Sequence, residues 1–149
     1  MPPESPLPRL SLVIPAYNEE GFLPRLLDSV DAAARRYPHG AAAVEVVVAD
    51  NASTDRTAEL ARARGCRVVP VAKRSIAAAR NAGGAAARGE FVGFVDADMQ
   101  IHPDTFNAIE RALASDRIVG GASGVTLERW SLGLAVTFAA WVSGWPTAW

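Results

Sequence analysis

The stretch Phe91-Val92-Gly93-Phe94-Val95-Asp96-Ala97-Asp98 joins a short apolar run to two carboxylates one residue apart. A continuous run of β-forming residues predicts a buried strand, typical of a parallel sheet. Open α/β sheets bind ligands at the carboxyl ends of their strands, where Asp96 and Asp98 fall. Such a pair can hold one hard cation, Mg²⁺ or Mn²⁺, with positions left open for phosphate oxygens. The alternative is that one aspartate caps the following turn and the other is solvated.

Similar apolar runs alternate with helical patterns along most of the chain. Strands are expected over residues 10–14, 44–49, 67–71 and 91–95, with short ones at 118–119 and 125–127. Helices are expected from Asn18 to about residue 37, over 53–65, over 75–88 and from residue 102 onward. This alternation predicts an α/β fold with a mostly parallel central sheet and helices on both faces, a Rossmann-like arrangement.

Several residues are suited to the ends of these helices. Asn18 is available as the N-cap of the first helix, and Ser53 and Asp55 as caps of the second. Gly65 suits the left-handed position after the second helix, and Gly89 is expected to stop the third.

Composition limits the classes of partner and compartment. A chain of 149 residues is long enough for one domain with a real core. Its 15 basic and 16 acidic residues give a net charge of -1, and no basic cluster occurs, so no nucleic-acid partner is expected. The single cysteine, Cys66, excludes a disulfide within the chain, fits a reducing compartment and is read as a small core residue. Residues 1–9 form a Pro-rich polar leader without the apolar segment of a signal peptide.

Residues 131–149 carry no charge and are rich in tryptophan. Their Gly, Ser, Thr and Pro content makes them a poor membrane span. Large apolar side chains fall near one face of a helix, at Trp130, Leu134, Phe138, Trp141 and Trp145. This pattern favours an amphipathic element that is covered by a membrane interface or by a partner.

Four polar segments follow predicted strands and should meet at one sheet edge: Pro15–Glu19, Asp50–Asp55, Arg80–Gly83 and Asp96–Asp98. Neither a Walker A loop nor a Gly-x-Gly-x-x-Gly turn follows the first strand, which disfavours other nucleotide folds. In this order and spacing the four segments resemble a family-2 glycosyltransferase of the GT-A fold, over about residues 10–127. The resemblance implies transfer of a sugar from a nucleoside-diphosphate donor.

The resemblance implies a nucleoside site in the first two segments. The residues expected to line the base and ribose are Pro15, Ala16, Tyr17 and Glu19. An aromatic ring gains stacking energy from a base, and a carboxylate accepts hydrogen bonds from ribose hydroxyls. Asp50 matches the acid that accepts the imide N–H of the base, which favours a UDP-sugar. The alternatives are a core edge for Tyr17, helix capping for Glu19 and a simple strand-end role for Asp50.

Arg80 is the basic residue of the third segment. By the resemblance it approaches the ribose or the diphosphate, where a guanidinium makes paired hydrogen bonds. Lys73 and Arg74 lie just upstream, and the alternative for all three is a solvated helix face. Gly83 and Gly84 are expected to allow close packing against the sheet.

The resemblance assigns the metal to the fourth segment. Asp98 coordinates the divalent ion directly, Asp96 contacts the ribose or the water ligands of the ion, and Ala97 lies between them in the donor site. The ion, Mn²⁺ or Mg²⁺, neutralises the leaving diphosphate. His102 is read as a helix-start residue in preference to a further metal ligand.

The acid that would deprotonate the acceptor hydroxyl is missing from the pattern. Glu110, Asp116 and Glu128 follow Asp98, but none matches the family, so the catalytic residue stays unassigned. We therefore expect an inverting glycosyltransferase of hexosyltransferase type, or its donor-binding core. The alternative is a catalytically incomplete nucleotide-sugar-binding module that acts through a partner or a homo-oligomer.

The expected organisation is a leader at 1–9, a nucleotide-sugar-binding domain at 10–128 and a tail at 129–149. Residues 130–149 are expected to mediate homo-oligomer formation or peripheral membrane contact. The expected location is cytoplasmic, with the inner face of the membrane as the place of any such contact.

Overall fold

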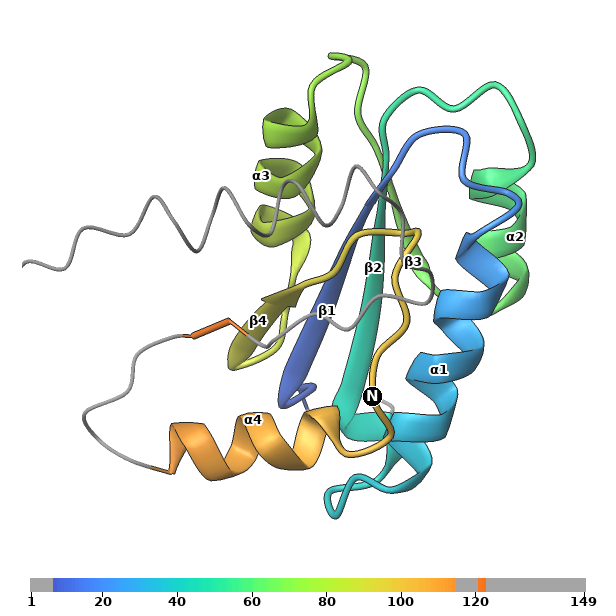
Figure 1. The fold of residues 1–149 in the computed structure, drawn as a ribbon. Coiled ribbons are helices and arrows are strands. Elements are labelled where there is room, and N and C mark those ends of the chain that lie inside the picture. Colours follow the sequence, from blue (N-terminus) through green and yellow to red (C-terminus); the bar gives the residue numbers. More distant parts are fainter. Residues whose placement is uncertain (1–6, 115–120, 123–149) are drawn as a thin grey trace, which may run out of the picture. The chain divides into compact units, whose positions relative to one another are not determined.

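Four parallel strands form the sheet of the computed structural model, which describes residues 7–114 and 121–122. Their order is β3-β2-β1-β4, and Figure 1 shows them side by side. The strands are β1 (Leu10–Ala16), β2 (Val44–Asp50), β3 (Arg67–Pro70) and β4 (Phe91–Phe94). All pairings are parallel, which confirms the α/β prediction. Residues 121–122 belong to a separate unit.

Helices cover both faces of this sheet. They are α1 (Leu23–Arg35), α2 (Thr57–Ala63), α3 (Ile76–Ala86) and α4 (Thr105–Leu113), with a 3-10 turn at Ala41–Ala43. In Figure 1, α3 lies on one side of the sheet and α1 and α2 lie on the other. The larger core contains Leu12 and Ile14 of β1, the apolar face of α1 and Phe106 of α4. A smaller core joins Ala49 and Ala79 beneath α3.

Helix α1 follows the predicted period, since Leu23, Leu26, Leu27 and Val30 are all buried. The predicted N-cap was wrong: the N-cap is Phe22, and no side chain caps the helix. Asn18 instead lies four residues earlier with a φ of 54°, a left-handed conformation that asparagine tolerates. The helix also ends two residues earlier than expected, at Arg35.

The other helix ends show where local signals hold and where they fail. Gly65 has the expected left-handed φ of 75°. The prediction that Asp55 caps α2 was wrong, since the N-cap is Arg56 without a side-chain cap, and Asp55 instead accepts from the amide of Thr57, the first residue of the helix. Ser53 does not cap α2, because its hydroxyl accepts from the amide of Asn18 instead.

Gly89 does not stop α3, which ends at Ala86 with Ala87 as its cap. A Cβ at position 89 would lie 2.6 Å from the backbone nitrogen of Ser11. Close passage along β1 is therefore the reason for this glycine.

The sequence-predicted strands at 118–119 and 125–127 and the tail at 129–149 lie outside the described residues. Within the described residues, no helix has the length and apolar character that crossing a bilayer needs.

Gly83 sets the distance between α3 and the sheet. A Cβ on this residue would lie 2.4 Å from Cγ1 of Val13 and 3.3 Å from Cβ of Ala49. Val13 and Ala49 are fully buried, so neither side has room to move. Gly84 meets only ordinary contact, 3.4 Å from the ring of Phe94.

We expect Gly83→Ala to destabilise the fold by about 1–3 kcal/mol, because it overpacks this contact. Urea unfolding followed by circular dichroism would measure the change in free energy. Gly21→Ala is the matched control, since a Cβ there meets nothing within 4 Å. Equal effects of the two substitutions would contradict close packing at Gly83.

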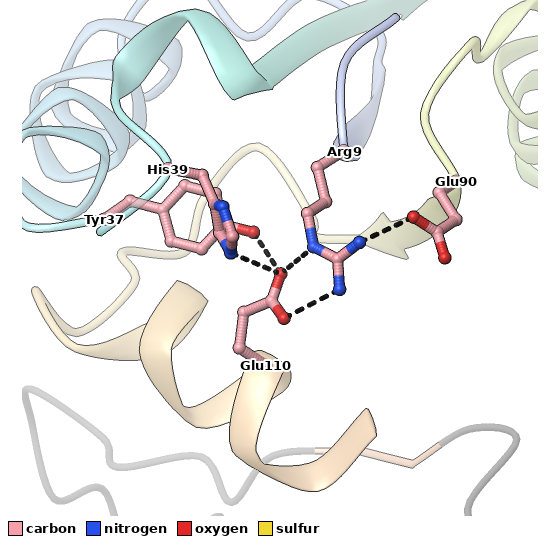
Figure 2. A network of polar contacts seen from close by, with 5 residues as sticks. All are labelled: Arg9, Tyr37, His39, Glu90 and Glu110. Atoms are coloured by element: carbon pink, nitrogen blue, oxygen red, sulfur yellow. Dashed lines mark hydrogen bonds and ion pairs between the residues drawn. The ribbon is translucent and has the colours of Figure 1, made fainter. Parts of the chain in front are cut away.

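A polar network joins α4 to the amino-terminal edge of the sheet (Figure 2). Arg9, just before β1, donates to both carboxylate oxygens of Glu110, over 2.5 and 3.0 Å. It also donates to Glu90, just before β4, over 2.7 Å. The Tyr37 hydroxyl donates to Glu110, and His39 lies 3.8 Å from the same oxygen. Since Glu110 belongs to α4, the network fastens that helix to the starts of two strands.

The network shifts the protonation equilibria of its members. The hydrogen bond from Arg9 holds the pKa of Glu110 below its ordinary value, against the opposing effect of burial. Burial and the hydrogen bond to Glu110 raise the pKa of Tyr37 to about 12. Glu110 therefore stays ionised, and Tyr37 stays protonated, over the physiological pH range.

Because the folded-state pKa of Glu110 is lowered, its contribution to stability is complete above the unfolded value of 4.5. That contribution is lost as the pH falls through the folded-state pKa. Glu110→Gln should therefore lower stability at neutral pH and flatten its decline below pH 4.5. Thermal unfolding between pH 3 and 7 would test this, with Glu59→Gln on the exposed side of α2 as control. A decline as steep in Glu110→Gln as in the parent would refute the assignment.

Candidate functional site

The carboxyl ends of the four strands bring the loops that follow them to one edge of the sheet. The register pairs Ala16 of β1 with Asp50 of β2, and Asp50 with Pro70 of β3. The loops after β1 and β2 therefore start side by side, as Figure 1 shows at the top of the sheet. Val95 continues the ladder of β4 by donating to the carbonyl of Val13, so the Asp96–Asp98 segment begins at the same edge.

Reciprocal hydrogen bonds join the loops after β1 and β2. The amide of Asn18 donates to the Ser53 hydroxyl over 3.1 Å, and its side-chain oxygen accepts from the amide of Thr54 over 2.8 Å. The amide of Glu20 donates to Asp55 over 3.1 Å, and its carboxylate accepts from the amide of Arg56 over 3.1 Å. The two loops therefore satisfy each other's polar backbone groups.

Thr57 is the buried centre of this contact, with no exposed surface. Its hydroxyl accepts from the amide of Glu19 over 2.8 Å and donates to Asp55 over 2.5 Å. Burial raises the pKa of Asp55, but the hydrogen bonds from Thr57 and Glu20 outweigh it and leave the pKa below its ordinary value. Thr57 thus fixes the backbone of the first loop from the start of α2.

Asp50 ends β2 at the base of these loops. One of its carboxylate oxygens accepts from the amide of Ser53 over 3.2 Å, and its backbone carbonyl accepts from Val71 over 2.8 Å. The side chain is half-buried, which suits a group that meets a ligand at the mouth of the site.

Tyr17 carries its ring at the rim of the site, 41% exposed. The guanidinium carbon of Arg74 lies 4.8 Å from the centre of that ring, a cation–π contact. Arg74 comes from the loop after β3, so this contact joins a third loop to the first.

The Asp96–Asp98 segment presents both carboxylates to solvent, while Ala97 between them is buried. Arg80 of α3 donates to Asp96 over 2.6 Å, so the structure brings the third and fourth predicted segments together. The Nε of Arg80 is buried and has no hydrogen-bond partner among the described residues. The Arg80 side chain as a whole is 43% exposed, so part of it is open to a group that enters the site.

The pKa of Glu19 responds to the other acids of the site. Burial raises its pKa, and the nearby Asp98, Asp55 and Asp96 raise it further. Acids from three loops thus repel one another at this edge, and a cation that arrives there relieves the repulsion. Their oxygens are the hard donors that Mg²⁺ and Mn²⁺ prefer.

No group of three His, Cys, Asp or Glu side chains in residues 7–114 is arranged to hold a metal. An ion bound by Asp98 and Asp96 would complete its shell with ligand and water oxygens, which is common for Mg²⁺ beside phosphates. His102 accepts a hydrogen bond from the amide of Asp104 through Nδ1, as a residue at the start of a helix does.

Two acids that follow Asp98 lie in the described part of the chain, Asp104 and Glu110, and each is paired with an arginine. Asp104 pairs with Arg36 over 3.1 Å. Glu110 binds Arg9 and Tyr37 at the amino-terminal edge of the sheet, opposite the site. Asp116 and Glu128 lie outside the described residues.

Sequence reasoning did not find the roles of Thr57, Asn51 and the Arg74–Tyr17 contact. The signal available was the density of polar residues in Asp50–Asp55, more than a single helix cap requires. Thr57 and Arg74 contact residues 38 and 57 positions away, and the side-chain partners of Asn51 lie 22 and 24 positions away. The spacing within the segment could therefore not name them.

Comparison with known proteins connects this geometry to an enzyme family. The family model described as glycosyl transferase family 2 matches residues 11–134. The undecaprenyl-phosphate 4-deoxy-4-formamido-L-arabinose transferase of Pseudomonas paraeruginosa is 41% identical over 123 residues, which cover 77% of this chain and 35% of the relative. The chain thus spans about a third of the length of this curated relative.

Solved structures also align with this chain. S. aureus TarS in complex with UDP-GlcNAc aligns with a TM-score of 0.59 and 30% identity, over 71% of this chain and 31% of that one. The mannosyltransferase PcManGT from Pyrobaculum calidifontis, in complex with GDP-Man and Mn²⁺, aligns with a TM-score of 0.65 and 29% identity, over 75% of this chain and 34% of that one.

We expect Thr57→Val to cost about 1–3 kcal/mol of stability, because the amide of Glu19 loses its acceptor and Asp55 loses a donor while the shape of the buried side chain is kept. Chemical denaturation would measure it. Thr54→Val is the control, since that hydroxyl is exposed and makes a single bond of 3.3 Å to Asn18. A cost no larger than that of the control would show that Thr57 does not hold the two loops together.

Proposed function

The chain belongs to glycosyl transferase family 2, and we propose that residues 10–128 form the nucleotide-sugar-binding domain of such an enzyme, with a divalent cation at the carboxyl edge of the sheet. The observation that carries the proposal is the convergence of Tyr17, Asp50, Arg80 and the Asp96–Asp98 pair at that edge. An aromatic ring, a hydrogen-bond acceptor, a guanidinium and a carboxylate pair suit the base, the sugar and the diphosphate of one ligand.

The base and ribose bind against the loop after β1. The exposed ring of Tyr17 offers a surface for stacking, and Ala16 and Pro15 form the buried floor beneath it. Glu19 is half-buried and offers its carboxylate to ribose hydroxyls. Asp50 accepts the imide N–H of the base, which favours uracil. The neighbours hold UDP-GlcNAc in one case and GDP-Man in the other, so both bases belong in the test.

The diphosphate and the cation bind at the loop after β4. Asp98 would be the direct ligand of the ion, and Asp96 would contact the ribose or the water ligands of the ion. The buried Ala97 lies between them. The ion supplies neutralisation of the leaving diphosphate, and either Mn²⁺ or Mg²⁺ suits oxygen ligands of this kind. Mn²⁺ is present in the structure of the mannosyltransferase. Arg80 holds Asp96 in place and directs its remaining N–H groups to phosphate or ribose oxygens.

The reaction proposed for the complete enzyme is sugar transfer with inversion to an acceptor hydroxyl. A hexose is the proposed group. A second function, binding of the nucleotide sugar without transfer, is favoured by one observation. Of the two carboxylates within residues 99–114, Glu110 is engaged at the opposite edge and Asp104 is paired with Arg36. That reading needs a partner or a second copy to supply the base.

The tail at 129–149 is proposed to contact that partner or the inner face of a cytoplasmic membrane. Its uncharged, Trp-rich sequence supports either surface. The leader at 1–9 has no proposed role.

Calorimetric titration of the chain with UDP and with GDP, with and without Mn²⁺, tests the donor site. We expect binding that depends on Mn²⁺. Asp98→Asn should weaken the affinity measured with Mn²⁺. Because Asp98 is proposed as a direct ligand, the loss should exceed the roughly 10- to 100-fold caused by removal of an outer-shell partner of a metal. Asp28→Asn, which removes a carboxylate from the exposed side of α1, should leave the affinity unchanged.

Equal affinity with and without Mn²⁺, or an Asp98→Asn affinity equal to that of the parent, would refute the metal-dependent donor site. If the chain binds UDP, an assay for free UDP released from a UDP-sugar distinguishes the two proposed functions. Release indicates transfer or hydrolysis, and no release indicates binding alone.

A further inference from the structure

We propose that Arg74 is a positioning residue for the nucleotide base, which it serves by holding the plane of the Tyr17 ring, and that Asn51 fixes the loop from which Arg74 reaches that ring. The inference rests on the proposed function and adds a residue that sets the geometry of base stacking.

The contact between Arg74 and Tyr17 is made across two loops. The guanidinium carbon lies 4.8 Å from the ring centre, inside the range in which a cation is attracted to the face of an aromatic ring. Tyr17 is 41% exposed, so its ring is not held by burial in the core. The stacked guanidinium therefore supplies an orientation that the surrounding packing does not.

Asn51 holds the two loops at the spacing this contact requires. Its side chain is buried, and its backbone amide donates to the carbonyl of Ala16, the residue before Tyr17. With the amide turned to satisfy both neighbours, its nitrogen donates to the carbonyl of Lys73 over 2.7 Å and its oxygen accepts from the amide of Ser75 over 3.1 Å. These bonds lie on either side of Arg74. One buried residue thus fixes the backbone beside both members of the stack.

The Tyr17 ring can serve two contacts at once. Arg74 lies over the ring while 41% of the residue stays exposed, and we place the base on that exposed part. A base stacked there would complete a layered arrangement of guanidinium, phenol ring and base. In this arrangement Arg74 acts through Tyr17 and does not touch the phosphates. The alternative is that Arg74 is a phosphate ligand and that its contact with Tyr17 has no role in base binding.

A double-mutant cycle on uridine affinity separates these two roles, because uridine has a base but no phosphate. Arg74→Met should weaken uridine binding about two- to fivefold, the range of an exposed cation–π contact. In a Tyr17→Leu background the same substitution should have no further effect. Lys73→Met is the matched control, since it removes the same charge from the neighbouring position and should leave uridine affinity unchanged.

The stack itself can be tested without any nucleotide. The chain has two tyrosines, so ring-labelled tyrosine gives two sets of NMR signals, and Tyr17→Phe assigns them. Arg74→Met should shift the Tyr17 signals and leave those of Tyr37 in place. Lys73→Met should shift neither.

Three results would overturn the inference. One is an Arg74→Met variant that loses UDP affinity but keeps uridine affinity, as a phosphate ligand would. Another is an equal effect of Arg74→Met with and without the Tyr17 ring. The third is an unshifted Tyr17 signal. A parent chain that binds neither uridine nor UDP would instead refute the proposed donor site itself, and the base-positioning role with it.

Discussion

The hydrogen-bonded pairing of β1 with β2 is the interaction on which the site depends. It sets Ala16 opposite Asp50, so the loops that follow leave the sheet at the same height and side by side. The next bond in line, from the amide of Asn51 to the carbonyl of Ala16, extends the pairing into the loops. A slip of one residue would turn every side chain of the strand to the other face and would move the two loops out of register.

The acids at the two edges of the sheet have opposite pKa shifts. At the amino-terminal edge, Glu110 is paired with Arg9, and its pKa is lowered, so that edge gains stability from its charges. At the carboxyl edge, Glu19 stands among Asp98, Asp55 and Asp96, and its pKa is raised by burial and by their charges. The charges of these three acids disfavour the ionised form of Glu19. A perturbed acid at the carboxyl ends of parallel strands is typical of a ligand site.

Order within the carboxyl edge comes from polar contacts between loops more than from an apolar core. Thr57 and Asn51 are buried side chains that use their hydrogen-bonding groups on the backbone of neighbouring loops. This keeps Asp50, Tyr17 and Arg74 in place before a ligand arrives. A preorganised site loses less conformational entropy on binding, which is the physical advantage of such a network.

The sequence by itself determined the strands, the helices that alternate with them and the edge at which the polar segments meet. It did so because burial imposes periods of two and 3.6 residues that are visible locally. Gly65 is also a local signal, because its own backbone takes a left-handed conformation at the end of α2. The tertiary structure decided what those segments bind to. Asn18, expected as a helix cap, binds Thr54 instead. Glu110 binds Arg9, and Arg80 binds Asp96. These contacts join residues 16 to 101 positions apart. No local period encodes such a distance, because it follows from how the strands pair and where each loop leaves the sheet.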